Sequence, residues 1–189
     1  DTRRSIVTAA AVSGDSNYNG LDPGNVSVTN TDNDTSGFTV SAISGPTSEA
    51  GGTATFTVVL TAQPTADVRF GLSSDDTMEG TVAPTSLTFT NGTWNTAQTV
   101  TVTGVDDALD DGDIAYSVVT AAATSSDTNY NGVNASDVSI TNTDNDVSGL
   151  TVTPTSGLTT TEGGGTTTFT VVLTAQPTAD VAAGLSSND

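Results

Sequence analysis

Acidic side chains gather in one short stretch of the sequence. Five carboxylates fall within eight residues, and they belong to Asp106, Asp107, Asp110, Asp111 and Asp113. Two like charges about 4 Å apart repel by roughly 4 kcal/mol at an effective dielectric constant of 20, so a folded chain must solvate, protonate or bridge such groups. Protein counter-charges are scarce, because the chain has no Lys or His and its only basic residues are Arg3, Arg4 and Arg69. A bound metal ion is the obvious substitute.

The metal that these ligands suit best is Ca²⁺. Calcium takes about six to eight oxygen ligands and accepts irregular geometry, which fits clustered carboxylates and loop carbonyls. A second acidic run, Asp144-Asn145-Asp146, follows the strand that the sequence predicts around Val138 and Ile140. The ends of these segments can lie at one pole of a β-sandwich, so the sequence predicts a calcium site there. The alternative is a solvated acidic turn, the usual role of an acidic run.

A second candidate calcium loop lies further along the chain. Counted from Asp127 as position 1, oxygen ligands stand at positions 1, 3 and 5, Gly at position 6 and a backbone carbonyl at position 7. This spacing matches the first half of an EF-hand-type loop. Position 12 lacks the usual bidentate Glu, although an Asp stands at position 11. The alternative is a simple Asn-Gly turn, and both interpretations stay open. The candidate ligands are Asp127, Asn129, Asn131 and Asp137, with Asp15, Asn17 and Asn19 in an earlier copy of the motif.

Several kinds of chemistry are excluded by composition. With no Cys, His or Lys, the chain cannot build the usual nucleophilic dyads, disulfides or thiolate zinc sites. Paired carboxylates serve glycoside hydrolysis in some proteins, but gathered at a sandwich pole they are explained more economically as metal ligands. We therefore expect no enzyme. Trp94 and Tyr130 offer a sugar-binding platform as an alternative, although Trp94 is more simply explained as packing over one end of the sandwich.

Charge and composition limit the partners. The net charge is −19 and the isoelectric point is about 4.1, which excludes binding to nucleic acid or anionic membranes by charge attraction. Thr accounts for 39 of the 189 residues, and this β-branched residue suits the solvent face of a strand. No apolar run reaches 18 residues, so no membrane insertion is predicted in this stretch. With no signal peptide and Asp1 in first place, the sequence is expected to be a piece of a longer protein.

The sequence repeats itself with a period of 112 residues. The hexapeptide at 15–20 recurs at 127–132, and the segment 26–34 recurs at 138–146. Residues 53–68 match 166–181 at an offset of 113. We interpret 1–34 as the C-terminal part of one repeat, 35–146 as a complete repeat and 147–189 as the N-terminal part of the next. The links between them are so short that adjacent domains must nearly touch.

Apolar residues alternate with polar ones throughout the complete repeat, which predicts strands and no helix. The expected fold class is all-β, with tandem immunoglobulin-like β-sandwich domains of about seven strands per repeat. The predicted inward rows are Phe38 and Val40; Ala54, Phe56, Val58 and Leu60; Val68, Phe70 and Leu72; Leu87 and Phe89; Val100 and Val102; Ile114, Tyr116 and Val118; Val138 and Ile140.

The complete repeat and both fragments resemble the Calx-β domain, a repeat of sodium/calcium exchangers, integrin β4 and many bacterial surface proteins. The resemblance is carried by the segments 48–58, 99–113 and 138–146. It implies a sandwich that binds calcium through an early Glu, a mid-domain Asp, an acidic turn and a terminal Asp run. The family's usual Gly-x-Asp-Tyr is replaced here by Ser74-Asp75-Asp76-Thr77. The implied ligands are Glu49, Asp75 or Asp76, Asp106, Asp107, Asp110, Asp111, Asp144 and Asp146, with Asp32, Asp34 and Glu162 at matching positions in the fragments.

These observations predict an extracellular or cell-surface structural protein. We expect an adhesin or surface filament whose domains and junctions are stiffened by Ca²⁺. Its expected partners are neighbouring repeats of the same chain and, in a homopolymeric filament, further copies. The alternative is a calcium-sensing or carbohydrate-binding accessory module of a larger secreted protein.

Overall fold

The computed structural model describes residues 2–187, and the chain divides into two compact units, Asp1–Thr35 and Ser36–Asp189. The regular structure of the described residues consists of β-strands. No helix within residues 2–187 is long and apolar enough to cross a membrane. The predicted all-β class is therefore confirmed.

The first unit is a long hairpin. Strands β1 (Thr2–Ile6) and β2 (Val26–Asn30) run antiparallel, with Thr2 opposite Asn30 and Ile6 opposite Val26. Every residue of both strands is exposed. The two strands therefore have no apolar layer of their own to cover them.

One sheet of the second unit has four strands, which are all antiparallel. Its order is β3 (Phe38–Val40), β5 (Thr53–Leu60), β9 (Gln98–Gly104) and β7 (Gly80–Ala83). The longest pairing joins β5 to β9, from Thr53 opposite Thr103 to Val58 opposite Gln98. Thr residues fill the outer positions of this pair except that of Val59, and the inner positions are apolar except that of Gln98.

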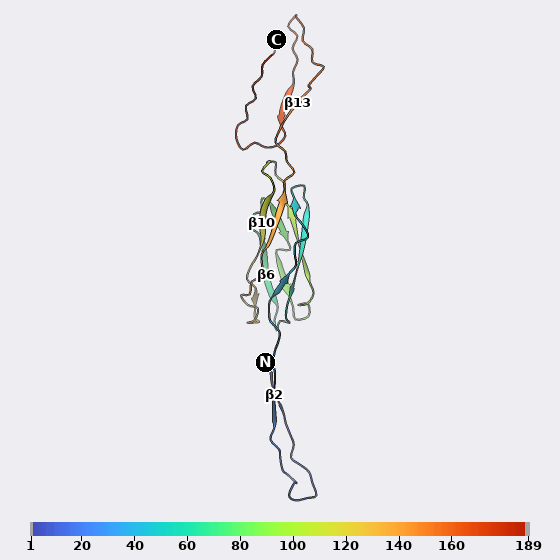
Figure 1. Cartoon of the computed structure of the whole chain (residues 1–189), viewed down its shortest axis with the longest axis vertical. Coiled ribbons are helices and arrows are strands. Elements are labelled where there is room, and N and C mark those ends of the chain that lie inside the picture. The colour runs from blue at the N-terminus through green and yellow to red at the C-terminus, as the bar shows by residue number, and fades with distance from the viewer. Residues whose placement is uncertain (1, 188–189) are drawn as a thin grey trace. The chain divides into compact units, whose positions relative to one another are not determined.

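The other sheet contains six strands, and two of them position residues of the candidate site. Its path is β11 (Thr124–Ser125), β6 (Val68–Ser74), β10 (Ile114–Thr120), β12 (Val138–Thr143) and β4 (Thr47–Ser48), and β8 (Ser86–Phe89) also pairs with β6. Strands β6 and β10 lie side by side at its centre (Figure 1). The pairing of β4 with β12 is parallel, unlike the other pairings in this sheet.

The two sheets pack face to face around one apolar core. The ring of Phe38 in the first sheet meets that of Phe70 in the second edge-on, with centroids 5.0 Å apart. Residues predicted to point inward are buried on β5, β6, β8, β9 and β12. The predicted sandwich and its seven strands are thus present. Strands β4, β7 and β11 were not predicted, because β4 and β11 have two residues each and β7 contains a single large apolar residue, Val82.

Residues 150–173 repeat the pairing of β3 with β5. Strand β13 (Leu150–Thr153) pairs antiparallel with β14 (Thr170–Leu173), and Leu150 lies opposite Leu173 as Phe38 lies opposite Leu60. The β1–β2 register likewise equals that of β10 and β12, shifted by the sequence repeat. Both fragments therefore keep the local pairing of the complete repeat.

Candidate metal centre

A parallel strand pair brings the first acidic residues of the site together. Thr143 of β12 lies opposite Ser48 of β4, so the next residues along, Asp144 and Glu49, leave the sheet side by side. The backbone N–H of Glu49 donates to the Thr143 carbonyl at 3.1 Å. One carboxylate oxygen from each of Glu49, Asp144 and Asp146 lies within 4.8 Å of the others. Glu49 is only 3% exposed.

A tight glycine turn holds Glu49 in this position. The N–H groups of Gly51 and Gly52 both donate to the Ser48 carbonyl at 3.0 Å. Gly51 has a φ of +79°, a conformation that favours glycine. Gly104 of β9 packs so closely that a Cβ at this position would overlap the Ser48 carbonyl. The sequence Ser48-Glu49-Ala50-Gly51-Gly52 thus forms a tight turn that places Glu49 beside the end of β12.

The acidic turn 106–113 meets the same corner through backbone hydrogen bonds. Asp144 accepts from the N–H of Asp146 at 2.7 Å and from that of Gly112 at 2.8 Å. Asp113 in turn accepts from the N–H of Asp144 at 3.1 Å. The two acidic runs that the sequence places far apart therefore lie together at one end of the sandwich.

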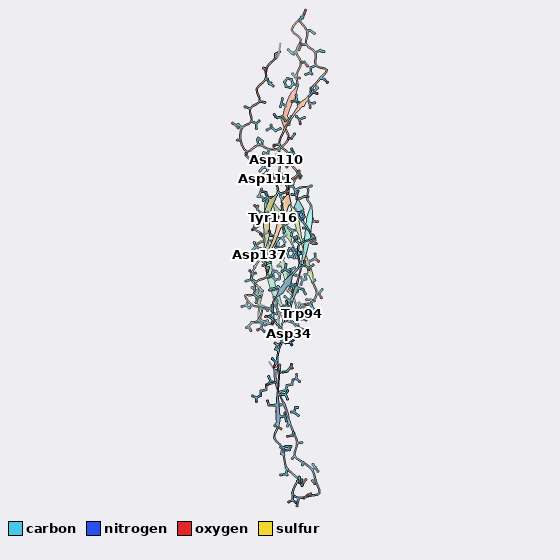
Figure 2. All side chains as sticks on the ribbon, viewed as in Figure 1. Asp34, Trp94, Asp110, Asp111, Tyr116 and Asp137 are labelled. Carbon is cyan, nitrogen blue, oxygen red and sulfur yellow. The ribbon has the colours of Figure 1, made fainter. Side chains whose placement is uncertain are left out.

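The remaining carboxylates of the turn have separate partners. Asp106 accepts from the Asn145 side chain at 3.1 Å, and Asp107 accepts from the N–H of Leu109 at 2.7 Å. Asp110 accepts from the N–H of Ser148 at 2.7 Å, which ties the turn to the segment leading into β13. Asp110 and Asp111 lie at the same end of the sandwich, and Trp94 lies at the opposite end (Figure 2).

Burial and mutual repulsion shape the electrostatics of the corner. Burial raises the pKa of Glu49, the N–H of Asn145 opposes this, and the nearby charge of Asp144 raises it further. The pKa of Asp146 is also raised, by burial first and then by the neighbouring carboxylates. The pKa of Asp144 is lowered by the N–H groups of Asp146 and Gly112. A cation here would relieve the repulsion and keep all three groups ionised.

A further buried acid, Glu79, lies beside this corner and escaped the sequence analysis. It is 8% exposed, and its carboxylate accepts from the Asn142 side chain at 3.3 Å. Asn142 also donates to the Val105 carbonyl and accepts from the Thr47 hydroxyl. Burial raises the pKa of Glu79, and the charges of Asp111 and Asp76 add to that rise. In the sequence, Glu79 is marked only by its position directly before Gly80, the first residue of β7. This signal is too weak to indicate a site.

The mid-domain acids Asp75 and Asp76 accept hydrogen bonds from backbone N–H groups. Asp75 accepts from the N–H of Ser117 at 2.6 Å, which fastens the end of β6 to β10. Asp76 accepts from the N–H of Met78 at 3.0 Å and so closes the turn toward β7. Neither is in the group formed by Glu49, Asp144 and Asp146.

Three of the four candidate ligands in the EF-hand-like segment accept hydrogen bonds from backbone N–H groups. The buried carboxylate of Asp127 accepts from the N–H of Thr65 at 2.8 Å and from that of Asn129 at 2.9 Å, and both bonds lower its pKa. The Asn131 side chain accepts from the N–H of Ser125. Asp137 accepts from the N–H and the hydroxyl of Thr120. These contacts hold the segment in a turn, and the calcium-loop and Asn-Gly-turn interpretations both stay open.

The same motif in the first unit keeps this local geometry. The N–H of Asn17 donates to Asp15 at 2.9 Å, and the Asn19 side chain accepts from the N–H of Ser13 at 3.1 Å. Further on, Asp32 accepts from the N–H of Asp34, as Asp144 does from Asp146. In the C-terminal fragment, Glu162 is exposed in a turn that a bridge between Thr161 and Gly165 closes. Each fragment thus carries one part of the acidic group.

Trp94 belongs to the packing of the sandwich. Its side chain is partly buried against the apolar core, and its carbonyl accepts from the N–H of Leu60. The buried Tyr130 hydroxyl donates to the Ala62 carbonyl and accepts from the N–H of Ala62. The two aromatic residues are therefore used in the structure of the domain and do not form an exposed platform.

The group Glu49, Asp144 and Asp146 could hold a metal ion. All its donors are carboxylate oxygens, which suit a hard cation such as Ca²⁺ or Mg²⁺ and offer no soft ligand for zinc or copper. Asp144 is already aimed by two N–H donors, so the site is partly ordered before any ion binds.

Comparisons with known proteins give no family. No protein-family model matches the chain, and no curated protein matches it. Among solved structures, the MSP-domain protein SSP-19 from Caenorhabditis elegans is 15% identical, with a TM-score of 0.37 over 55% of this chain and 97% of its own. Domains 4 and 5 of the surface layer protein SbsC are 19% identical, with a TM-score of 0.33 over 76% of this chain and 69% of theirs. We draw no functional conclusion from likenesses of this size.

Proposed function

We propose that this chain is part of an extracellular structural protein whose β-sandwich repeats are stiffened by Ca²⁺. The observation that carries the proposal is the convergence of Glu49, Asp144 and Asp146 in a chain with a net charge of −19. Carboxylates held this close favour a divalent cation over an empty site, because the ion replaces their repulsion by attraction.

The stiffening would act through the hydrogen bonds that leave the site. Asp144 is bound to Gly112 and Asp113 of the acidic turn, so an ion on Asp144 also fixes that turn. The turn contacts the following segment at two places: Asp110 accepts from Ser148, and the Ala108 carbonyl accepts from the N–H of Gln176 at 2.6 Å. Ion binding at the corner therefore reaches the junction between one repeat and the next.

The composition and the resemblance to Calx-β domains support an extracellular role. Extracellular calcium modules bind in the range of about 10⁻⁴–10⁻³ M, which a group of three carboxylates suits. A chain with no Lys and few Arg offers hardly any sites to trypsin-like proteases. We assign it no catalytic role and propose an adhesin or surface filament as its context.

Thermal unfolding of the 189-residue chain tests the proposal. When calcium is raised from none, in the presence of chelator, to 10 mM, the melting temperature of the complete repeat (35–146) should rise. An ion present at about 100 times its Kd stabilises a fold by roughly 2.7 kcal/mol. Asp144→Asn should remove most of that rise, whereas Asp67→Asn, a change in the same repeat outside the acidic corner, should keep it. A midpoint at micromolar calcium would favour the sensor alternative. An unchanged melting temperature in the wild-type protein would overturn the proposal.

A further inference from the structure

Four buried polar side chains are hydrogen-bonded in series inside the complete repeat. They belong to Tyr116, Thr47, Asn142 and Glu79, which are 3%, 1%, 1% and 8% exposed. The Tyr116 hydroxyl lies 3.0 Å from the Thr47 hydroxyl, and the Thr47 hydroxyl donates to the side-chain oxygen of Asn142, also at 3.0 Å. The side-chain nitrogen of Asn142 donates to Glu79 at 3.3 Å. A hydroxyl, a carboxamide and a carboxyl are thus in contact and shielded from water.

Both sheets contribute to this series. Thr47 on β4 lies opposite Asn142 on β12 in the parallel pair of the six-stranded sheet. Tyr116 comes from β10 of the same sheet, whereas Glu79 directly precedes β7 of the four-stranded sheet. The hydroxyl and the amide therefore belong to neighbouring strands, and the carboxyl reaches the amide from the other sheet.

The orientation of the Asn142 amide is fixed by its surroundings. Its nitrogen donates to the Val105 carbonyl at 3.1 Å as well as to Glu79, so its oxygen is the atom that faces Thr47. Gly104 packs against the same amide so closely that a Cβ there would overlap the side-chain oxygen. The Thr47 hydroxyl therefore lies beside the carbonyl group of Asn142, one covalent bond away from its carbon, Cγ.

We propose that Thr47 and Asn142 react to form an intramolecular ester that links β4 to β12. Thr47 Oγ1 attacks Asn142 Cγ, so an Oγ1–Cγ bond forms, the Cγ–Nδ2 bond breaks and the nitrogen leaves as ammonia. The reaction needs no oxidant, metal or second substrate. It takes place once in each molecule, so it is a self-modification of the chain and not an enzymatic turnover.

Glu79 would carry the proton that this reaction moves. Burial raises the pKa of Glu79, which favours a carboxyl that holds a proton beside Nδ2. In the tetrahedral intermediate Oγ1 and Nδ2 are bonded to the same carbon. Glu79 can therefore give a proton to Nδ2 and take back the proton of the Thr47 hydroxyl. The ammonia leaves with two hydrogens of the amide and one from the hydroxyl, and the carboxyl ends as it began.

Position and burial compensate for two weakly reactive groups. A Thr hydroxyl is a poor nucleophile and an amide a poor electrophile, so the reaction depends on holding them together. Thr47 and Asn142 are held by strand pairing, and the Tyr116 hydroxyl orients the Thr47 hydroxyl as a positioning residue. Exclusion of water also protects the ester from hydrolysis once it has formed.

The ester would change how the repeat bears force. Tension along the chain enters the complete repeat before β4 and leaves it after β12. A covalent bond between Thr47 and Asn142 would carry that load directly and shield residues 48–141 from stretching. This consequence rests on the proposed structural function, whereas the bond itself does not.

The mass of the intact chain tests the proposal. Wild-type protein, purified in chelator and incubated in the folded state, should lose the mass of one ammonia. After digestion at Asp and Glu, the peptide that contains Thr47 should be joined to the one that contains Asn142. Mild alkali should separate the two, because an ester hydrolyses there and an amide does not. Folded wild-type protein that yields no joined peptide would overturn the proposal and leave the four groups as a hydrogen-bonded network only.

Variants identify the reacting groups. Thr47→Val keeps the shape of the side chain and removes the nucleophile, so it should give no joined peptide, whereas Thr47→Ser keeps a hydroxyl and should give it. Glu79→Gln keeps an acceptor for Asn142 but relays no proton, so the ester should form more slowly by about tenfold or more. Thr55→Val, at an exposed position on β5, should react like the wild type. A Glu79→Gln protein that reacts at the wild-type rate would overturn the role of Glu79.

Calcium separates this inference from the proposed function. A joined peptide in a protein whose melting temperature ignores calcium would contradict the calcium stiffening and leave the ester standing. A melting temperature that responds to calcium in a protein without the joined peptide would overturn the ester alone.

Discussion

Glu49 and Asp144 are neighbours because each directly follows one of two strands that run parallel. The strands are β4 and β12, and the N–H of Glu49 donates to the carbonyl that precedes Asp144. The parallel direction makes both chains leave the sheet at the same edge, so both carboxylates arrive there together. An antiparallel pairing of the same two strands would send the two acids to opposite ends.

The burial of Glu49 predicts that Glu49→Gln has opposite effects on the melting temperature without and with calcium. Glu49→Gln removes a charge whose pKa is raised by burial, so at neutral pH without calcium the variant should melt at a higher temperature than the wild type or at the same one. With calcium the order should reverse, because the variant has lost a ligand. Calorimetry in chelator and in calcium measures both.

The matched control for this prediction is Glu162→Gln. It makes the same change in the exposed counterpart of Glu49, at a position outside the complete repeat. It should leave the melting of that repeat unchanged in both solutions. A Glu49→Gln protein that keeps the full calcium response would show that this carboxylate is no ligand.

The contact between Asp110 and Ser148 predicts local protection from hydrogen exchange. Asp110→Ala removes the acceptor of the Ser148 N–H, so this amide should exchange at least tenfold faster. The Ser148 side chain, and after it the Ser148 N–H, lower the pKa of Asp110, so the protection should persist at neutral pH and fade when acid protonates the carboxylate. Residue-resolved exchange measurements report it directly.

Asp111→Ala serves as the control for the exchange experiment. It changes the neighbouring charge and leaves the acceptor of Ser148 in place. If Ser148 exchanges equally fast in the wild type and in Asp110→Ala, the junction is not held by this bond.

The sequence predicts the strands well because most of the repeat obeys one rule. Apolar and polar residues alternate from Phe56 to Val58 and from Val100 to Val102, and all four side chains are buried in the core. The rule fails for β4, whose two residues are too short to alternate. The site depends on this strand, so its decisive pairing could not be read from local pattern.

The sequence predicts that the two acidic runs meet, because both runs follow strands. It does not predict which single acids accept backbone N–H groups instead. The meeting of 106–113 with 144–146 follows from two strand ends at one pole. Asp75 and Asp127 carry the same charge but lie outside the group of Glu49, Asp144 and Asp146. Their carboxylates accept backbone N–H groups of Ser117 and Thr65. Sequence cannot separate a ligand from such a cap, because both need an acid beside a strand.

Asp127 predicts a stability loss that depends on pH. Two N–H donors lower its pKa below the ordinary 3.8, so its contribution to stability is present above that value and is lost as the pH falls through the depressed pKa. Asp127→Asn should therefore destabilise the repeat at neutral pH by about 2 kcal/mol, the size expected for weakened hydrogen bonds to a charged group. The difference from wild type should shrink in acid.

Urea unfolding between pH 3 and pH 7 would measure the effect of Asp127. Asp15→Asn makes the same change in the exposed copy of the motif and should leave the unfolding of the complete repeat unaltered. A difference between wild type and Asp127→Asn that grows toward acid would contradict the assigned role.

Trp94 predicts a loss of stability without a loss of binding. Its indole packs against the apolar core, so Trp94→Ala should cost about 3 kcal/mol, the lower end of the range for large aromatic side chains. Denaturant unfolding measures this cost, and polysaccharide pull-down should be equally negative for wild type and variant. Retention of a polysaccharide by the wild type alone would restore the sugar-binding alternative.

Because Gly104 packs closely against the turn that carries Glu49, we expect a larger residue at position 104 to disturb the candidate metal site. A methyl group there would overlap the Ser48 carbonyl and the Asn142 side chain, and a backbone carbonyl cannot swing aside. Gly104→Ala should therefore push β4 away from β12, move Glu49 from Asp144 and lower stability by about 1–3 kcal/mol, as overpacking does. The calcium-induced rise in melting temperature should fall with it. Gly92→Ala, where the nearest atom lies 3.9 Å from the new methyl group, should change neither quantity. A Gly104→Ala protein with a normal calcium response would mean that the parallel contact of β4 with β12 does not position the ligands.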